Sequence, residues 1–323
     1  MCAKYGSSRK NQPKALAAFT NLYSNMALAL PKLPGWVKLL LKLLVTGGCL
    51  WYVGQKINWT STWQLLLNAR LGWLLLAALL FMASKWVSAI RLQFYFGNLG
   101  LRLSAPVNLA LYWLGMFYNL FLPGGIGGDA YKVILLNRHY PQHSLKKLGA
   151  AVLLDRISGV AGLGILAALF FGWLFKNTWY GLAAMAAIMP GVVLFKWIVG
   201  KWFASFVRSF WPTLWLGLAV QALQVLCVWA IMASIGLQQH FAAFQFLFLL
   251  SSIVAIFPFT IGGLGARELV FLWGAGQFAL AQQEAVFISL LFYVITVAVS
   301  ALGAVWVFKQ PLPKHYNHTN FTT

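Results

Sequence analysis

A glycine-rich turn with the sequence Pro123-Gly124-Gly125-Ile126-Gly127-Gly128-Asp129-Ala130-Tyr131-Lys132 organises this chain, and a second turn of the same design reads Pro258-Phe259-Thr260-Ile261-Gly262-Gly263-Leu264-Gly265-Ala266-Arg267. Both contain Pro-x-x-Ile-Gly-Gly with a base four positions after the last shared glycine. Each turn separates an apolar run from another helix-like stretch. Non-helical backbone is tolerated at membrane depth only where protein or a water-filled cavity satisfies its polar groups. A repeated pair of such breaks indicates a transport site, and two ordinary surface turns are the alternative.

Composition sets the class of protein. The 323 residues are 61% hydrophobic and only 9% charged, with 16 Trp, which predicts a polytopic membrane protein. The net charge of +20 comes from bases spread between apolar spans, a pattern typical of the positive-inside rule. We therefore expect no nucleic-acid partner. The three cysteines are too scattered for a disulfide framework or a metal site, and we expect no cofactor and no metal.

The apolar runs define the expected spans, since about 20 apolar residues cross the hydrocarbon core. They cover residues 36–54, 71–90, 105–122, 148–175, 179–199, 211–235, 244–257 and 283–307. The run 244–257 is too short to cross and ends at Pro258, and the run 105–122 ends at Pro123. These two runs and the segments after them, 128–139 and 263–278, therefore predict two helical hairpins that enter the membrane and return on the same side.

Basic residues set the expected orientation. Residues 1–42 contain seven bases and no acid (Lys4, Arg9, Lys10, Lys14, Lys32, Lys38 and Lys42), which predicts a cytoplasmic N-terminus. Lys85, Arg91 and Arg102 then lie on or near the inner side. The bases that follow the first turn (Lys132, Arg138, Lys146 and Lys147) and those of the middle of the chain (Lys196, Lys201 and Arg208) also favour the cytoplasm. The first hairpin therefore enters from the cytoplasm, and the second from the opposite side.

The expected fold is an all-α polytopic membrane protein with six full transmembrane helices and two re-entrant helical hairpins. Its divisions are a basic cytoplasmic segment 1–35, a first membrane repeat 36–175, a second repeat 176–308, and a cytoplasmic tail 309–323. Each repeat contains three full crossings. Because three is odd, the second repeat must be inverted relative to the first, as in many transporters.

Acidic residues are scarce, and three of the four fall within the predicted membrane region: Asp129, Asp155 and Glu268. An ionisable group inside a bilayer costs about 2.5–3.5 kcal/mol on insertion scales, and is a functional-site hypothesis by default. We expect the fourth acid, Glu284, to be interfacial.

Two of these acids have a base as their neighbour in the sequence, in Asp155–Arg156 and Arg267–Glu268. Consecutive residues point to different faces of a helix. We therefore expect pairs between helices, such as Asp129 or Asp155 with Arg156 or Arg267. Such pairs either hold the helix packing or bind substrate.

The glycines of both turns leave backbone amides uncovered. A helix that begins just after such a turn attracts an anion with its positive end. A phosphate head group suits this environment and the nearby Lys132 or Arg267. A nucleotide-binding P-loop is excluded, because no Gly-Lys-Ser/Thr follows either turn.

Three motifs resemble one known family, the lysylphosphatidylglycerol synthase transmembrane-region family, also called flippase-like domain proteins. The run from Asn119 to Asp129 resembles its first signature, Leu154-Asp155-Arg156 its following Asp-Arg motif, and Gly262-Gly263-Leu264-Gly265-Ala266-Arg267-Glu268 its late Gly-Gly-x-Gly-x-Arg-Glu motif. Arg91 is matched to a further family arginine. The resemblance covers roughly residues 36–310. Lys132 stands where many relatives carry Arg, which keeps the charge but loses bidentate phosphate geometry.

The resemblance implies a lipid-translocating membrane module. The last predicted span ends at residue 307, so we expect the soluble synthase domain of the two-part relatives to be absent, and no aminoacyl transfer. We expect a lipid flippase or transporter of the bacterial inner membrane, and not an enzyme, that moves an anionic phospholipid or a polyprenyl-phosphate-linked lipid. A membrane transferase acting on a lipid-linked substrate, and a non-catalytic partner subunit of a cell-envelope enzyme, are the alternatives. The expected substrate-binding residues are Arg91, Asn119, Gly127, Gly128, Asp129, Lys132, Asp155, Arg156, Gly262, Gly263, Arg267 and Glu268.

Overall fold

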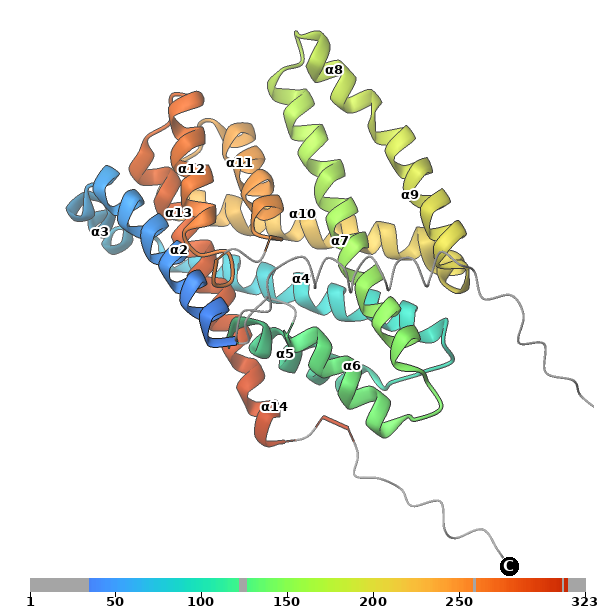
Figure 1. Ribbon diagram of the computed structural model, residues 1–323. Helices are drawn as coiled ribbons and strands as arrows, with labels where there is room; N and C mark the ends of the chain where they lie inside the picture. Colours follow the sequence, from blue (N-terminus) through green and yellow to red (C-terminus); the bar gives the residue numbers. More distant parts are fainter. Residues whose placement is uncertain (1–34, 122–126, 258–259, 310, 313–323) are drawn as a thin grey trace, which may run out of the picture.

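The computed structural model describes residues 35–121, 127–257, 260–309 and 311–312, and within them every regular element is helical (Figure 1). The elements up to the middle of the chain are α2 (Gly35–Lys56), α3 (Trp59–Leu67), α4 (Leu71–Gly97), α5 (Ala105–Phe121), α6 (Gly127–His139) and α7 (Leu145–Leu174). They are followed by α8 (Trp179–Ala186), α9 (Ile188–Trp202), η1 (Ala204–Ser209), α10 (Phe210–Ser234), α11 (Phe241–Val254), α12 (Ala266–Gln277), α13 (Gln282–Ala301), η2 (Leu302–Ala304) and α14 (Val305–Phe308). Three parts of the sequence lie outside the described residues: the prolines of both glycine turns, residues 1–34 of the predicted segment 1–35, and most of the tail.

Five helical stretches are long and apolar enough to cross a membrane: Leu71–Gly97, Leu145–Leu174, Trp179–Trp202, Ala204–Ser234 and Gln282–Phe308. They coincide with five of the six predicted spans. The sixth predicted span, 36–54, forms α2, but several side chains of its first two turns lie outside the described part of the chain. An all-helical membrane protein is therefore confirmed, and the count of six crossings stays a prediction.

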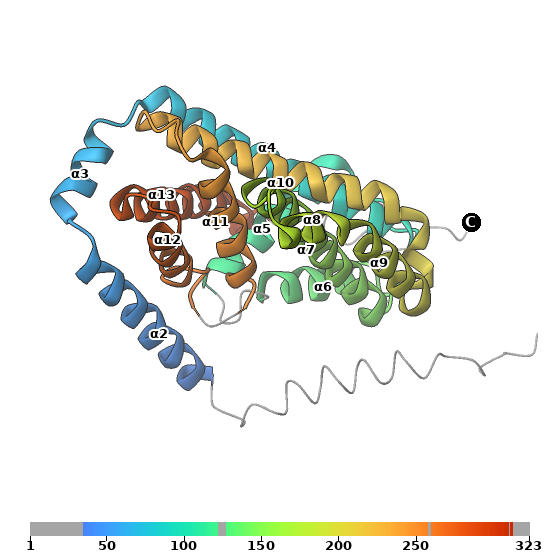
Figure 2. The ribbon, with the colours of Figure 1, turned by 90° about the horizontal axis from the view of Figure 1, so that it is seen from above.

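Helices α4 and α10 form the centre of the fold and run antiparallel along each other (Figures 1 and 2). At one end, the amide of Arg70 donates to the carbonyl of Ser234 at 2.9 Å. At the other end, Asn98 Nδ2 donates to Ser209 Oγ at 2.8 Å. The first contact joins the start of α4 to the end of α10, and the second joins the end of α4 to the start of α10. The two long helices therefore pair over their full length.

Helix α7 packs against this central pair at a row of small residues. A Cβ atom on Gly162 of α7 would lie 2.8 Å from the backbone of Gly217 in α10, and one on Gly217 would lie 2.7 Å from the carbonyl oxygen of Ser158. Only residues without a side chain permit this approach of two backbones. The consequence is that α4, α7 and α10 share one tightly packed interior.

Each glycine turn connects two helices that are shorter than the five long stretches and pack on each other, α5 with α6 and α11 with α12. At a rise of about 1.5 Å per residue, α6, α11 and α12 are roughly 18–21 Å long, which is less than the thickness of about 30 Å of a hydrocarbon core. A Cβ on Gly128 would lie 1.9 Å from the carbonyl oxygen of Gly115, so the backbones of α5 and α6 are in contact. The two predicted helix pairs are present, and their re-entrant course stays a prediction.

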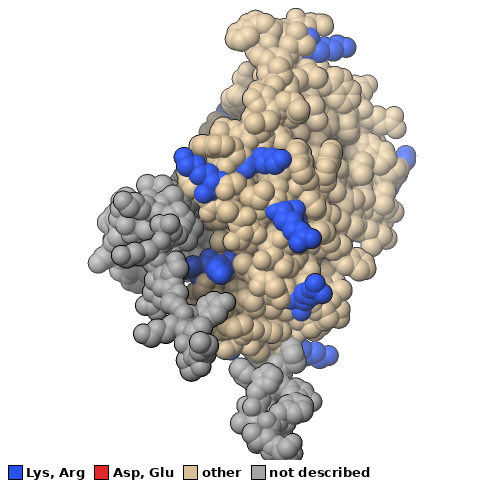
Figure 3. All heavy atoms as spheres, turned by 90° about the vertical axis from the view of Figure 1, so that its right-hand side faces the viewer, with Lys and Arg blue, Asp and Glu red and all other residues tan. Residues whose placement is uncertain are grey.

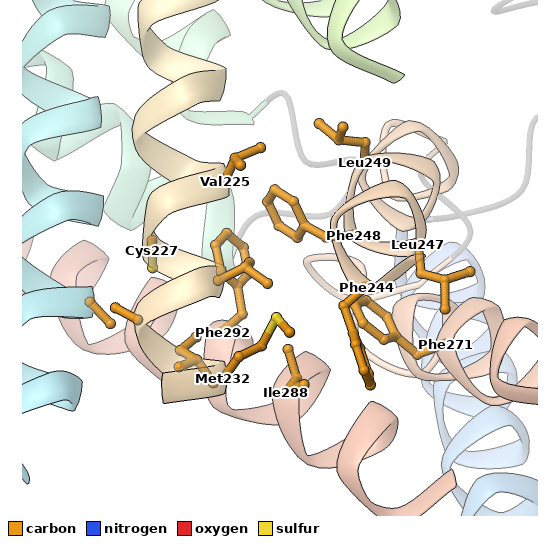
Figure 4. Close-up of a cluster of buried hydrophobic side chains, with 14 of the residues drawn as sticks. Val225, Cys227, Met232, Phe244, Leu247, Phe248, Leu249, Phe271, Ile288 and Phe292 are labelled. Carbon is orange, nitrogen blue, oxygen red and sulfur yellow. The ribbon is translucent and has the colours of Figure 1, made fainter. Parts of the chain in front are cut away.

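Two large hydrophobic clusters lie on either side of the middle of α4, and a small third one joins α2 to α12 and α13. Figure 4 shows the first, in which α10, α11, α12 and α13 contribute side chains such as Met232, Phe248, Phe271 and Phe292. The second lies under α5, α6 and the start of α7, and includes Leu111, Leu136 and Leu148 together with Leu92 and Phe96 of α4. On α4, the buried polar residues Ser84, Ser88 and Arg91 separate Phe81 of the first cluster from Leu92 of the second.

Candidate functional site

Asp129 is the first acid of the interior and lies in the first turn of α6. Its Oδ1 atom is 2.7 Å from Lys132 Nζ, one turn along the same helix, and its Oδ2 atom accepts a hydrogen bond from Arg156 Nε on α7. Both Asp129 and Lys132 are buried. The carboxylate therefore holds two cations and joins α6 to α7.

The position of Lys132 depends on a glycine and an aromatic ring of α5. Its aliphatic chain passes over Gly115, where an added Cβ would lie 2.7 Å from Lys132 Cε. Its ammonium lies 4.9 Å from the centre of the Tyr112 ring, a distance typical of a cation–π contact. The α5 surface thus fits the stem of this lysine and directs its charge towards Asp129.

Asp155 forms a second ion pair, in which Arg91 Nε of α4 lies 2.7 Å from its Oδ1 atom. Both side chains are buried. The Arg91 guanidinium lies beside two glycines, because a Cβ on Gly159 or Gly217 would approach its Nη1 atom to 3.2 or 3.5 Å. Nη1 is buried and has no hydrogen-bond partner within the described residues. The Arg91 guanidinium therefore keeps one buried donor unsatisfied.

The neighbours Asp155 and Arg156 direct their side chains to different helices, one to α4 and the other to α6. The prediction of pairs between helices is confirmed for Asp129 with Arg156. Asp155, however, pairs with Arg91 rather than with Arg156 or Arg267. Helix α7 therefore fixes α4 and α6 through adjacent residues.

The backbone conformation of the second glycine turn requires glycine at three positions. Gly262, Gly263 and Gly265 have φ values of 61°, 85° and 85°, a region that side chains disfavour. The Glu268 carboxylate, which is fully buried, turns back and accepts the Gly265 amide at 2.6 Å. Its other oxygen accepts the Ser289 hydroxyl of α13 at 2.7 Å.

Glu268, an expected substrate-binding residue, has both of its carboxylate oxygens occupied within the protein. Its two oxygens are used by a helix-capping amide and a serine, and the described part of the chain contains no ion pair to it. A carboxylate in the first turn of a helix satisfies free amides and complements the helix dipole. We therefore interpret Glu268 as a structural cap of α12.

Arg267 lies half-buried at the start of α12 and contacts two other helices. Its Nη1 atom donates to Ser252 Oγ of α11 at 3.1 Å, and its guanidinium carbon lies 5.2 Å from the centre of the Phe292 ring of α13. No carboxylate within the described residues forms an ion pair with it.

Lys85, which was expected on or near the inner side, is a further base beside the predicted site residues. It lies in the middle of α4, with its ammonium 4.4 Å from the centre of the Phe81 ring. The Phe81 and Phe292 rings meet edge to face at 5.5 Å. Lys85 and Arg267 therefore flank one aromatic pair. A base in the centre of a long apolar run was the signal that could have identified it.

The predicted site residues form two groups, with Lys85 between them. Around α6 and α7 lie Arg91, Asn119, Gly127, Gly128, Asp129, Lys132, Asp155 and Arg156, and around the start of α12 lie Gly262, Gly263, Arg267 and Glu268. Asn119 Oδ1 accepts the amide of Gly128 at 2.9 Å and so caps α6. Among the described residues, five bases (Lys85, Arg91, Lys132, Arg156 and Arg267) and three acids (Asp129, Asp155 and Glu268) give this region a net charge of +2, although Lys85, Arg156 and Arg267 are only partly buried.

Fold and site define a helical membrane protein whose interior contains buried ion pairs and a surplus of positive charge beside two glycine turns. The model of the lysylphosphatidylglycerol synthase TM region family matches residues 39–303. The chain belongs to this family, as its motifs predicted.

A curated relative is a UPF0104 membrane protein from Pyrococcus horikoshii, which is 28% identical over 123 residues. The match covers 38% of this chain and 36% of that protein, so the chain spans about a third of its curated relative. No solved structure matches the chain.

Proposed function

We propose that this protein moves a lipid with an anionic head group, an anionic phospholipid or a polyprenyl-phosphate-linked lipid, from one leaflet of the membrane to the other. The observation that carries the proposal is that the half-buried bases Arg267 and Lys85 lack an ion-pair partner within the described residues. Uncompensated charge inside a membrane is costly. A phosphate group that enters between the two bases compensates it.

The order of the elements supports a transporter architecture. The same order of elements occurs twice: a long helix, a pair of short helices joined by a glycine turn, and another long helix. The first copy is α4, α5–α6 and α7, and the second is α10, α11–α12 and α13. The corresponding helices α4 and α10 run antiparallel, as inverted repeats require. On this proposal the short pairs enter the membrane and return, and α6 and α12 begin near the repeat interface, where such transporters bind their substrates.

Charge supports one orientation. Exposed bases lie just after α4, at the end of α6 and the start of α7, and at the end of α9 and in η1: Arg102, Arg138, Lys146, Lys147, Lys201 and Arg208. These ends lie on the right-hand side of Figure 1, and Figure 3 shows Lys and Arg but no acid on the visible described surface of that side. By the positive-inside rule this side is cytoplasmic. A bacterial inner membrane and cytoplasmic termini are parts of the same proposal.

In the proposed mechanism, the head group leaves water and contacts Arg267 and Lys85 while the hydrocarbon tails stay in lipid. A phosphate accepts several hydrogen bonds from a guanidinium in fixed geometry. The ion pairs of Asp129 and Asp155 keep the nearby cations compensated before the lipid arrives. Rocking of the two repeats, with the glycine turns as hinges, then exposes the head group to the other side.

The test is movement of fluorescent lipids in proteoliposomes, measured with a membrane-impermeant quencher. We expect Arg267→Ala and Lys85→Met to slow movement of an anionic lipid at least tenfold, about 1.4 kcal/mol of barrier. Arg138→Ala, which removes an exposed base of α6, is the matched control and should keep the wild-type rate.

Two outcomes oppose the proposal. Wild-type rates in both interior variants remove these bases from the pathway. No movement of any anionic or prenyl-linked lipid by the wild-type protein favours a partner subunit or a membrane transferase instead.

A further inference from the structure

The short helix α3 takes no part in the proposed transport site. It connects α2 to α4 and lies at the edge of the molecule in both Figure 1 and Figure 2. Its nine residues extend about 14 Å at a rise of about 1.5 Å per residue, so α3 cannot cross a hydrocarbon core of about 30 Å. None of its residues is buried. In a membrane protein, such a helix lies either in water or at the membrane surface.

Both ends of α3 are fixed to the rest of the fold. Before its start, Ile57 is buried in the small cluster that joins α2 to α12 and α13, and the Asn58 side chain caps α3 by accepting the Ser61 amide at 3.2 Å. After its end, the Arg70 amide donates to the Ser234 carbonyl at 2.9 Å. Helix α4 begins at the next residue and is long and apolar enough to cross a membrane. Helix α3 therefore lies where a membrane-spanning helix starts.

The surface of α3 has three different sides. Four large apolar side chains are exposed and share one face by their three- and four-residue spacing: Trp59, Trp63, Leu66 and Leu67, with exposed fractions of 60%, 61%, 39% and 68%. The polar Thr60 and Gln64 are exposed next to this apolar face. Ser61, Thr62 and Leu65 are half-buried, and α3 contacts α13. A helix with an apolar side, a polar side and a side on the protein fits the boundary between hydrocarbon and water.

The residues around α3 agree with this boundary. The helix itself contains no charged residue, whereas the exposed Lys56 precedes it and the exposed Arg70 follows it. Long basic side chains reach water from the edge of the hydrocarbon, and tryptophan is enriched at the level of the head groups. The Trp59 ring lies beside the last turns of α2, because a Cβ on Gly54 would approach its Cζ2 atom to 3.4 Å. Two tryptophans between two bases therefore indicate the head-group level.

We propose that α3 is an interfacial helix, whose partner is the lipid surface where α4 begins. Its apolar face lies at the boundary between head groups and acyl chains, and its polar face meets water. The contact uses amphipathic side chains, so it requires no particular head group and no anionic lipid. It holds the connection between α2 and α4 at a fixed depth. Because this depth does not depend on lipid movement, the inference stands apart from the proposed function.

The test is the depth of a fluorescent label at single positions of α3 in proteoliposomes. Trp63→Cys on the apolar face and Gln64→Cys on the polar face each carry a nitrobenzoxadiazole label, in a chain whose own three cysteines are replaced by Ala. The quenchers are phosphatidylcholines brominated near the head group or near the chain end, and iodide on both sides of the membrane.

The two positions should differ in the quencher that reaches them. Interfacial helices bury their apolar face by about 5–10 Å, so the shallow brominated lipid should quench the label of Trp63→Cys at least about twofold more than the deep one. Iodide should quench the label of Gln64→Cys at least about twofold more than that of Trp63→Cys. Leu67→Cys, at a position that is 68% exposed, repeats the measurement on the apolar face should Trp63 prove necessary for folding.

Two control positions calibrate the depth. Trp86→Cys labels an exposed residue in the middle of α4, and the deep brominated lipid should quench it most. Lys146→Cys labels an exposed residue in the first turn of α7, and iodide should quench it most. These controls also show that the substituted chain is inserted as the wild type is.

Three outcomes overturn the proposal. Equal quenching of positions 63 and 64 by iodide places α3 in water. Strongest quenching of the apolar face by the deep brominated lipid places α3 in the hydrocarbon core as an extension of α2. Protection of the apolar face from every quencher shows that protein, such as a second copy of this chain, covers it instead of lipid.

Discussion

Replacement of Asp129 by Asn removes one charge with almost no change of shape, and tests whether the carboxylate stabilises the fold. Lys132 Nζ lies 2.7 Å from it, with only 5% of its side chain exposed. At an effective dielectric constant of about 20, two unit charges at this 2.7 Å separation attract by about 6 kcal/mol. Part of this attraction offsets the desolvation of both groups. Loss of one partner of a buried pair costs about 3–5 kcal/mol, because the other charge stays buried alone.

We expect Asp129→Asn to lower the free energy of unfolding by that amount of about 3–5 kcal/mol. Addition of Lys132→Met should recover at least half of the loss, since the stranded ammonium is then gone. The Arg156 side chain is 38% exposed and can be solvated. The assay is equilibrium unfolding in mixed micelles, followed by the fluorescence of the 16 Trp.

Glu284→Gln is the control, because it removes the same charge from a half-buried acid without an ion pair in the described part of the chain. It should change stability by less than about 1 kcal/mol. The reasoning is refuted if Asp129→Asn is as stable as this control, or if the double variant is no more stable than the single one.

The same unfolding assay checks three further substitutions. Gly128→Ala places a Cβ 1.9 Å from a carbonyl oxygen of α5 and should lower the free energy of unfolding by roughly 3 kcal/mol. The control Gly149→Ala meets nothing within 4 Å and should raise the free energy of unfolding by about 0.5–1 kcal/mol. Equal effects of the two substitutions would show that the backbones of α5 and α6 are not in close contact. Ser289→Ala removes a donor from the buried Glu268 and should cost about 1–3 kcal/mol, and wild-type stability would argue against the capping role. Gly265→Ala, at φ 85° and with its Cβ 2.7 Å from a side chain of α2, should cost at least about 1 kcal/mol; no loss would contradict the backbone conformation of the second turn.

Much of the fold could be read from local pattern. A helix that crosses a membrane must be long and apolar, so five spans were predictable from composition alone. The glycine turns were equally visible, because Gly262, Gly263 and Gly265 have backbone conformations that other residues disfavour.

The candidate site was only partly predictable. That Asp155 and Arg156 turn to different helices followed from helix geometry, but their partners did not. Arg91 lies 64 positions from Asp155 in the sequence, and which base reaches an acid depends on how the helices are rotated and crossed. For the same reason, the sequence did not show that the Glu268 carboxylate accepts from the Gly265 amide and the Ser289 hydroxyl.

The sequence by itself therefore determined the class, five of the six predicted spans and the family, since each depends on residues that are neighbours along the chain or on the same helix. Only the tertiary structure decided which charges are compensated and which are left over. Interior electrostatics depends on distances between helices, and the packing of glycines at Gly115, Gly159 and Gly217 sets those distances. The surplus charge at Lys85 and Arg267, on which the proposed function rests, is a property of that packing.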